Sequence, residues 1–247
     1  MEEKYKNYFI IADVHLNKNN EIITKNFESL LDKLANYENS CLIIAGDFVD
    51  FWFENKKYDL AAEYPMLENL KKYTERIDIY LIKGNRDFLA DKRFEKNSGI
   101  KILGDEIILE IANKKYFITH GDIFCVKDIS YKIWRLFSRG ILVKVLSNII
   151  PQKIVLWLIL KLRELSTLKN MRKNILNMSI VLSEIKRRCE QLKCDIVICG
   201  HNHNLREVFL GKKLKVIVLH RMRDWGTYYI HLDESCGNKY ITTFFAN

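Results

Sequence analysis

Several features that mark other classes of protein are missing from this chain of 247 residues. Its six cysteines form no CxxC pair and several lie inside apolar runs, so we expect reduced, buried thiols and a reducing compartment. No basic segment followed by an apolar one opens the chain, so no signal peptide is visible and we expect a cytoplasmic protein. No repeat, low-complexity tract or linker is present. We therefore predict a single domain over residues 1–247, with room for an inserted subdomain.

The chain has fewer acidic than basic residues. The chain has 40 Lys and Arg against 31 Asp and Glu, a formal net charge of +9. This excess favours an anionic partner such as a nucleic acid, a membrane surface or a phosphorylated substrate, although a lysine-rich solvated surface accounts for it equally well. Outside one apolar and basic segment, no basic stripe interleaved with aromatic residues stands out, and there is no recognised nucleic-acid-binding motif. We therefore expect no nucleic-acid partner and rank a nuclease last.

Short apolar runs alternate with segments of helical periodicity, and each run ends at a polar cluster. The helical segments are residues 26–37 and 65–73. Continuous β-branched runs are typical of strands covered on both faces, so the alternation predicts an α/β sandwich. We also expect the end of the chain, at 213–220, 226–232 and 239–245, to form antiparallel strands joined by turns. The predicted strands before it are 8–13, 41–47, 77–85, 115–122 and 194–203.

Metal-binding side chains gather at the ends of these runs, and they include four of the six histidines. Oxygen and imidazole donors at the carboxyl edge of a sheet suit Mn, Zn or Fe(II), and the lack of cysteine argues against a structural zinc site. Two such ions can clamp a phosphoryl group and activate water, which indicates hydrolysis at phosphorus. The clustered residues are Asp13, His15, Asp47, Asp50, Asn85, His120, His201 and His203.

Each motif taken singly has an ordinary structural explanation. Asp13 and His15 could cap a helix that follows a strand, and "GDFVD" and "GHNH" could be polar turns. Five such clusters in order, each ending a predicted strand, are much harder to explain in that way. The constellation as a whole therefore indicates a metal centre.

The ordered motifs resemble those of the calcineurin-like metallophosphoesterases. They are DxH at Asp13, GDxxD at Asp47, GN at Asn85, HGD at His120 and GHxH at His201. The resemblance implies a four-layer αββα fold and a dinuclear centre, for which we expect Mn(II), with Asp50 or Asp122 orienting ligand imidazoles. It also implies that one ion is held by Asp13, His15, Asp47 and His203, and the other by Asp47, Asn85, His120 and His201.

Arg86 follows Asn85, at a position where many members of this superfamily carry histidine. A guanidinium does not release its proton near neutral pH, so Arg86 should bind phosphate oxygens and not act as a general acid. The motif "GNRDF" resembles that of the family members that act in lipid A biosynthesis. These enzymes cleave UDP-2,3-diacylglucosamine to UMP and 2,3-diacylglucosamine 1-phosphate. The resemblance implies that Asn85 and His201 stabilise the developing charge and, with Arg86, contact the substrate. The alternative is a metallophosphoesterase acting on another phosphodiester or a nucleotide.

Residues 129–173 form a long apolar and basic segment after the HGD motif. Polar residues interrupt it too often for a bilayer span, so we expect either an amphipathic helical pair on the core or a helical lid that admits lipid tails. The lipid A branch favours the lid, which would also attach the enzyme to the cytoplasmic face of an anionic inner membrane. By the same resemblance we expect substrate contacts from Asp128, Ser166, Asn170 and Lys173.

This chain departs from the family pattern at a few positions. Asn202 stands where Thr is more common, and Glu54 and Asn55 replace acidic residues after the GDxxD motif. None of these side chains is an expected metal ligand. The departures therefore bear on the substrate and not on metal binding.

Overall fold

The computed structural model describes residues 4–52, 64–126, 154, 180–211, 213–234 and 239–245. The predicted lid at 129–173 lies outside the described residues, apart from Ile154, which is helical. The expected substrate contacts Asp128, Ser166, Asn170 and Lys173 also lie outside them. The lid and these contacts therefore remain predictions.

A six-stranded mixed sheet occupies one half of the molecule, in the order β11-β10-β1-β2-β3-β4. Neighbours from β1 to β4 pair in parallel, whereas β10 pairs with β1 and with β11 in antiparallel fashion. The strands are β1 (Asn7–Ile11), β2 (Ser40–Ala45), β3 (Asp78–Ile82), β4 (Lys101–Ile102), β10 (Gly226–Asp233) and β11 (Lys239–Phe245).

A five-stranded mixed sheet faces the first, in the order β5-β6-β7-β9-β8. Its three central strands β6, β7 and β9 are parallel, and the edge strands β5 and β8 are antiparallel to their neighbours. The strands are β5 (Glu106–Ile111), β6 (Lys114–Thr119), β7 (Ile196–Cys199), β8 (Arg206–Leu210) and β9 (Leu214–Val218).

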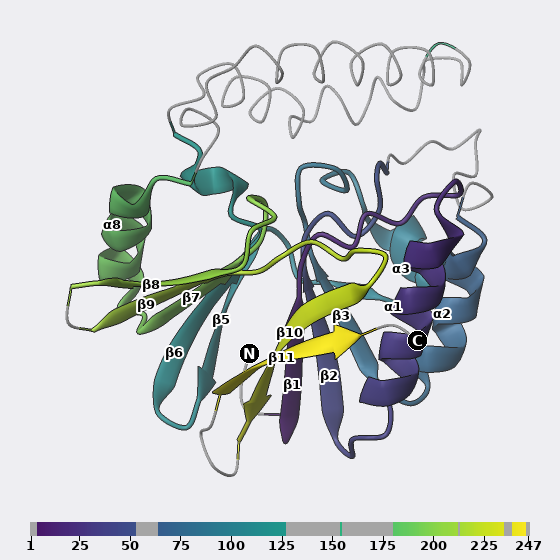
Figure 1. Cartoon of the computed structure of the whole chain (residues 1–247), viewed down its shortest axis with the longest axis horizontal. Coiled ribbons are helices and arrows are strands. Elements are labelled where there is room, and N and C mark those ends of the chain that lie inside the picture. The colour runs from purple at the N-terminus through teal and green to yellow at the C-terminus, as the bar shows by residue number, and fades with distance from the viewer. Residues whose placement is uncertain are drawn as a thin grey trace.

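Helices cover the outer face of each sheet (Figure 1). The helix α1 begins where the Asn20 side chain accepts a hydrogen bond from the Ile23 amide at 3.2 Å, which satisfies an otherwise unpaired donor. Asp91 caps α3 in the same way, and Gly99 ends it with a φ of 76°. The helices are α1 (Glu21–Leu34), α2 (Met66–Thr74), α3 (Lys92–Ser98), the short 3₁₀ helix η2 (Asp122–Phe124) and α8 (Leu182–Leu192).

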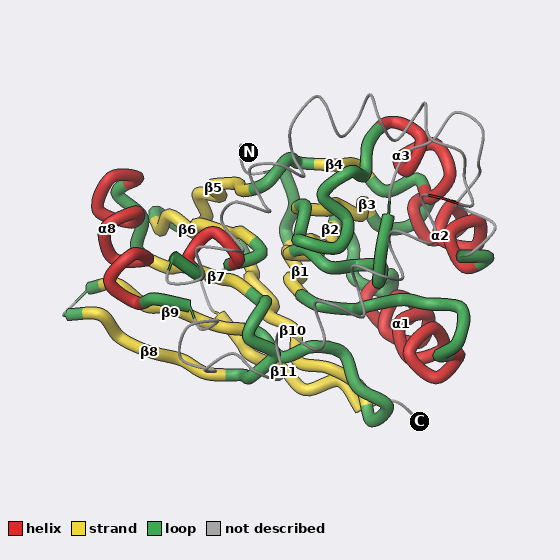
Figure 2. The backbone as a smooth tube through the Cα atoms, turned by 90° about the horizontal axis from the view of Figure 1, so that it is seen from above, coloured by secondary structure: helices red, strands yellow, loops and turns green. Residues whose placement is uncertain are grey.

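Three apolar layers separate the helices and sheets. Alternate residues of each central strand point to opposite faces, so Phe9 packs against α1 while Ile10 packs between the two sheets. On the far side, Val197 packs under α8 with Ile185. Seen from above, the order is helices, sheet, sheet and helix (Figure 2). This explains why the strands are continuously apolar, because both of their faces are covered.

Two details of the prediction need correction. The predicted helix at 26–37 is α1, which begins earlier, at Glu21, because Asn20 caps it, and ends at Leu34. The three C-terminal strands do not form one antiparallel group, since β9 belongs to the five-stranded sheet and pairs in parallel with β7. Only β10 and β11 form the expected antiparallel pair. The segment between β9 and β10 therefore carries the chain from one sheet to the other.

Candidate metal centre

The predicted ligands follow the carboxyl ends of five strands. Asp13 follows β1, Asp47 follows β2 and Asn85 follows β3 in the six-stranded sheet. His120 directly follows β6, and His201 follows β7, in the other sheet. The parallel strands of each sheet end at the same edge, and this is where ligands bind in open α/β sheets. Because the two sheets pack face to face, the two sets of side chains meet.

The backbone turns sharply at the predicted ligands. Nine described non-glycine residues have a positive φ, and five of these are predicted ligands. Such a conformation costs on the order of 1 kcal/mol or more for a residue with a side chain, although Asp and His tolerate it better than most. Strain of this kind concentrates at functional sites. The five are Asp13 (φ 54°), His15 (55°), Asp47 (51°), His201 (68°) and His203 (56°).

Three glycines pack directly against predicted ligands, and sequence reasoning missed this role. A methyl group added to any of them would lie closer than 3.0 Å to a ligand atom. The signal was present, because each glycine directly precedes a ligand in GD, GN or GH, although it packs against a ligand from a different strand. The contacts run from the ideal Cβ of Gly46 to His120 Cγ at 2.6 Å, of Gly84 to Asp47 Oδ1 at 2.2 Å, and of Gly200 to Asp13 Oδ2 at 2.3 Å.

Asp13, His15 and His203 form the first cluster. Asp13 Oδ1 lies 3.4 Å from His203 Nε2 and 3.7 Å from His15 Nε2. The two Nε2 atoms lie 3.4 Å apart, so three potential ligand atoms face a common point. His15 Nδ1 lies 3.4 Å from Asp50 Oδ1. This agrees with the expectation that Asp50 orients a ligand imidazole.

Asn85, His120 and His201 meet beside Asp47 in the second cluster. Asn85 Oδ1 lies 2.9 Å from His120 Nε2 and 3.0 Å from His201 Nδ1. The two imidazole nitrogens are 3.2 Å apart. His120 Nδ1 is 3.1 Å from the Ala45 carbonyl oxygen, which leaves Nε2 free to face the cluster. All four side chains therefore present a donor atom to one small space.

The two clusters are joined through their aspartates. Asp47 Oδ1 lies 3.6 Å from His120 Nε2, while Oδ2 lies 3.9 Å from His15 Nε2. One oxygen of Asp47 thus faces each cluster, as a bridging carboxylate would require. Asp13 also belongs to both groups, since it lies with Asp47 and His120 as well as with His15 and His203. Two adjacent metal sites with shared carboxylates fit this arrangement.

The donor set itself fits divalent cations. Asp13 Oδ1 is buried and has no hydrogen-bond donor among the described residues, which is costly for a carboxylate unless a cation compensates it. Unprotonated imidazole nitrogens that face one another at 3.2 Å and 3.4 Å would repel without a cation between them. Carboxylate, amide and imidazole donors suit Mn, Fe or Zn. The residues present therefore fit the predicted ions.

Electrostatic coupling within the site is strong. Burial alone would raise the pKa of Asp13, but the close approach of His203 and the charges of the nearby histidines lower it. Burial would lower the pKa of His120, but the charges of Asp47 and Asp13 raise it to about 9. Burial and the charge of His120 lower the pKa of His201 to about 4. Perturbation in both directions within one cluster is characteristic of functional sites.

Arg86 is fixed to the site through its backbone. Its amide donates to Asp47 Oδ1 at 2.8 Å, and its carbonyl oxygen accepts from the Trp52 amide at 3.0 Å. The side-chain Nε is buried and has no hydrogen-bond partner in the part of the chain that the structure describes. A buried guanidinium nitrogen without a partner, next to a predicted metal ligand, is consistent with a role in binding an anionic substrate.

The sequence of the chain matches a known family over most of its length. A sequence model described as calcineurin-like phosphoesterase matches residues 7–205. The chain belongs to this family. Its two Asp/His clusters are therefore the candidate metal sites of a metallophosphoesterase, a hydrolase.

Several relatives of this metallophosphoesterase are named UDP-2,3-diacylglucosamine hydrolase. The protein from Blochmanniella pennsylvanica is 30% identical over 240 residues, covering 95% of each chain. That from Haemophilus ducreyi is 30% identical over 235 residues, covering 92% of this chain and 96% of its own. Among solved structures, an archaeal phosphodiesterase aligns over 96% of this chain and 99% of its own, with 15% identity and a TM-score of 0.48.

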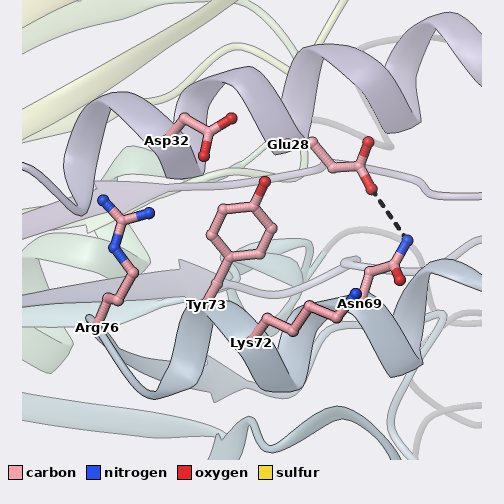
Figure 3. Close-up of a pocket in the computed structure, with 6 residues that line it drawn as sticks. All are labelled: Glu28, Asp32, Asn69, Lys72, Tyr73 and Arg76. Atoms are coloured by element: carbon pink, nitrogen blue, oxygen red, sulfur yellow. Dashed lines mark hydrogen bonds between the residues drawn. The ribbon is translucent and has the colours of Figure 1, made fainter.

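A hollow of about 400 Å³ lies between α1 and α2, away from the metal centre. It has two carboxylates on α1, Lys72 on α2 and Arg76 just after the end of α2 (Figure 3). It contains none of the predicted site residues; its lining is Glu28, Asp32, Asn69, Lys72, Tyr73 and Arg76.

Within the described part of the chain, no helix combines the length and the apolar character needed to cross a membrane.

Proposed function

We propose that this protein hydrolyses the pyrophosphate bond of UDP-2,3-diacylglucosamine, giving UMP and 2,3-diacylglucosamine 1-phosphate, a step of lipid A biosynthesis. The observation that carries the proposal is the similarity to a UDP-2,3-diacylglucosamine hydrolase over 95% of both chains. The two adjacent Asp/His clusters support it, because they suit hydrolysis at phosphorus. We expect two Mn(II) ions as cofactors.

The geometry of the two clusters supports the proposed ligand assignment. Bound ions would supply an activated water and neutralise phosphate charge. In the proposed arrangement Asp47 offers one oxygen to each ion, and Asn85 and His201 both face the space where phosphate oxygens would lie. Asp13, His15 and His203 complete one site, and His120 completes the other.

Arg86 has the role of holding the diphosphate. Its backbone is tied to Asp47, so a phosphate bound by the guanidinium would be held close to the metal ligands. Arginine is a poor general acid, but the leaving group here is a phosphate monoester, which needs little protonation to depart. The reaction can therefore proceed with arginine where other members of the superfamily use histidine.

The insertion at 129–173 is proposed as the lid over the acyl chains. The described residues that flank this part of the chain lie close together, since the Val181 amide donates to the Phe124 carbonyl oxygen at 3.0 Å. Phe124 lies in η2, four residues after the proposed ligand His120, and this position in the chain supports a lid near the metal centre. Asp128, Ser166, Asn170 and Lys173 are the proposed substrate contacts. Basic and apolar residues in the insertion would attach the enzyme to an anionic membrane.

The test is UMP release from UDP-2,3-diacylglucosamine in detergent with Mn(II), measured beside hydrolysis of bis(p-nitrophenyl) phosphate. We expect a much higher kcat/KM for the lipid. Cleavage of the generic diester alone would refute the lipid substrate and favour a metallophosphoesterase acting on another phosphodiester or nucleotide. Asp47→Ala should abolish both activities, and full activity in that variant would overturn the metal centre.

A further inference from the structure

Asp87 is a buried carboxylate that belongs to neither ligand cluster. Its side chain is completely inaccessible to solvent, although it follows Asn85 and Arg86 in the loop after β3. A carboxylate that is fully buried loses its hydration, so its presence at this position carries an electrostatic cost. Such a cost is retained only where the carboxylate makes compensating hydrogen bonds.

The two oxygens of Asp87 bind two different loops. Oδ1 accepts from the Gly84 amide at 2.6 Å, within its own loop. Oδ2 accepts from the Phe48 amide at 2.7 Å, in the loop after β2. Gly84 precedes the predicted ligand Asn85, and Phe48 follows the predicted ligand Asp47. A single side chain thus joins the two loops that bear the ligands.

The same two loops make further contacts at this point. The Arg86 amide donates to Asp47 Oδ1 at 2.8 Å, and the Trp52 amide donates to the Arg86 carbonyl oxygen at 3.0 Å. Gly84 also packs against Asp47 more closely than any residue with a side chain could. Asp87 is the only side chain among these that is hydrogen-bonded on both sides of the junction. Without the Asp87 side chain, the position of Asn85 relative to Asp47 would no longer be fixed.

We propose that Asp87 is a positioning residue, which sets the separation of Asp47 and Asn85 and so preorganises the metal centre. Because both of its oxygens already accept short hydrogen bonds from backbone amides, it acts through the neighbouring ligands and does not bind an ion itself. The inference rests on the metal centre of the proposed function but not on the lipid substrate. Metal binding therefore tests it even if the substrate proves to be different.

The decisive variant is Asp87→Asn in the full chain. Asparagine has the same shape but only one acceptor oxygen, and its amide group would meet a backbone N–H donor. We expect the affinity for Mn(II), titrated calorimetrically into metal-stripped protein, to fall roughly 10- to 100-fold, as is typical when groups that orient metal ligands are lost. Saturating Mn(II) should leave the KM for bis(p-nitrophenyl) phosphate close to wild type and kcat reduced.

Asp91→Ala is the control for loss of stability. Asp91 lies four residues further along, and its side chain accepts a hydrogen bond from the Arg93 amide at 3.1 Å as the N-cap of α3. This substitution removes the capping oxygen, so it should lower Tm but leave the affinity for Mn(II) unchanged. A role of Asp87 in stability alone predicts that both variants lose Tm and neither loses Mn(II) affinity, and that result would overturn the proposal.

A second measurement needs no variant and applies if Asp87→Asn does not fold. The amides of Gly84 and Phe48 should be strongly protected from hydrogen exchange in the metal-loaded wild-type protein, because both are bonded to a buried carboxylate. Exchange at either amide as fast as in an unstructured peptide would show that the junction is open and would refute the proposal.

Discussion

Replacing Gly84 by alanine tests whether the position of Asp47 controls the metal centre. The backbone of Gly84 does not have a positive φ, so alanine can adopt it without conformational strain. The added Cβ, however, would lie 2.2 Å from Asp47 Oδ1 and 2.4 Å from the Asp47 backbone nitrogen. Rotation of the side chain can move Oδ1, but the backbone nitrogen can move only if the loop that bears Asp47 shifts.

The expected magnitude follows from this overlap. Relief of the contact requires Asp47 to shift by on the order of 1 Å, and a misplacement of that size can reduce a rate by about 100-fold. Forcing an extra methyl group into a packed interior costs about 1–3 kcal/mol in the free energy of unfolding. We therefore expect Gly84→Ala to fold with a lower Tm, to bind Mn(II) more weakly and to hydrolyse bis(p-nitrophenyl) phosphate about 100-fold more slowly.

Gly104→Ala provides the control for general destabilisation. Gly104 has a φ of 88°, and no described residue has an atom within 4 Å of an added Cβ. Alanine there is strained by about 1 kcal/mol but meets none of the described residues, so Tm should fall while Mn(II) affinity and kcat remain at wild-type values. Wild-type Mn(II) affinity and kcat in Gly84→Ala would refute the reasoning, since they would show that the position of Asp47 is not critical.

Three further predictions concern the ions, the substrate and pH. Removal of divalent ions with a chelator should abolish hydrolysis, and Mn(II) should restore it; activity that persists in excess chelator would contradict the metal centre. Arg86→Ala should lower kcat/KM for a diphosphate substrate by roughly 10- to 100-fold through lost charge-assisted hydrogen bonds, and an unchanged value would exclude the assigned role. Asp78 is a partly exposed residue whose pKa burial alone would raise, but hydrogen bonds from Lys101 and Tyr5 lower it to about 2. Because this pKa is depressed, the stabilisation is present above pH 4 or so and is lost as the pH falls through about 2. Asp78→Asn should therefore reduce the free energy of unfolding by about 1 kcal/mol at neutral pH, and urea denaturation should show this difference shrinking at acid pH. A difference that does not depend on pH would contradict the assignment.

The parallel strands that sequence reasoning found share one property, which is burial on both faces. β1, β2, β3, β6 and β7 are nearly continuous apolar runs, and each coincides with a predicted run that extends past the end of the strand into the polar cluster. The edge strands β5 and β8 were missed because they are partly exposed and mix charged with apolar residues. The assignment of β9 to the second sheet was also missed, because strand pairing is decided by packing across the sandwich and leaves little trace in local sequence.

The residue pattern along the chain predicts the chemistry of the site. Residue type and strand periodicity are local properties, so the positions of Asp, Asn and His after apolar runs predict the donor set and the edge of the sheet that bears it. How the donors meet could be seen only in the folded molecule, because the pairs that matter are far apart in the chain. The His201 amide donates to Asp13 Oδ2 at 2.8 Å, across the interface of the two sheets. Likewise, only packing shows that Gly84 must lack a side chain to make room for Asp47, or that Asp87 joins two loops from inside the core.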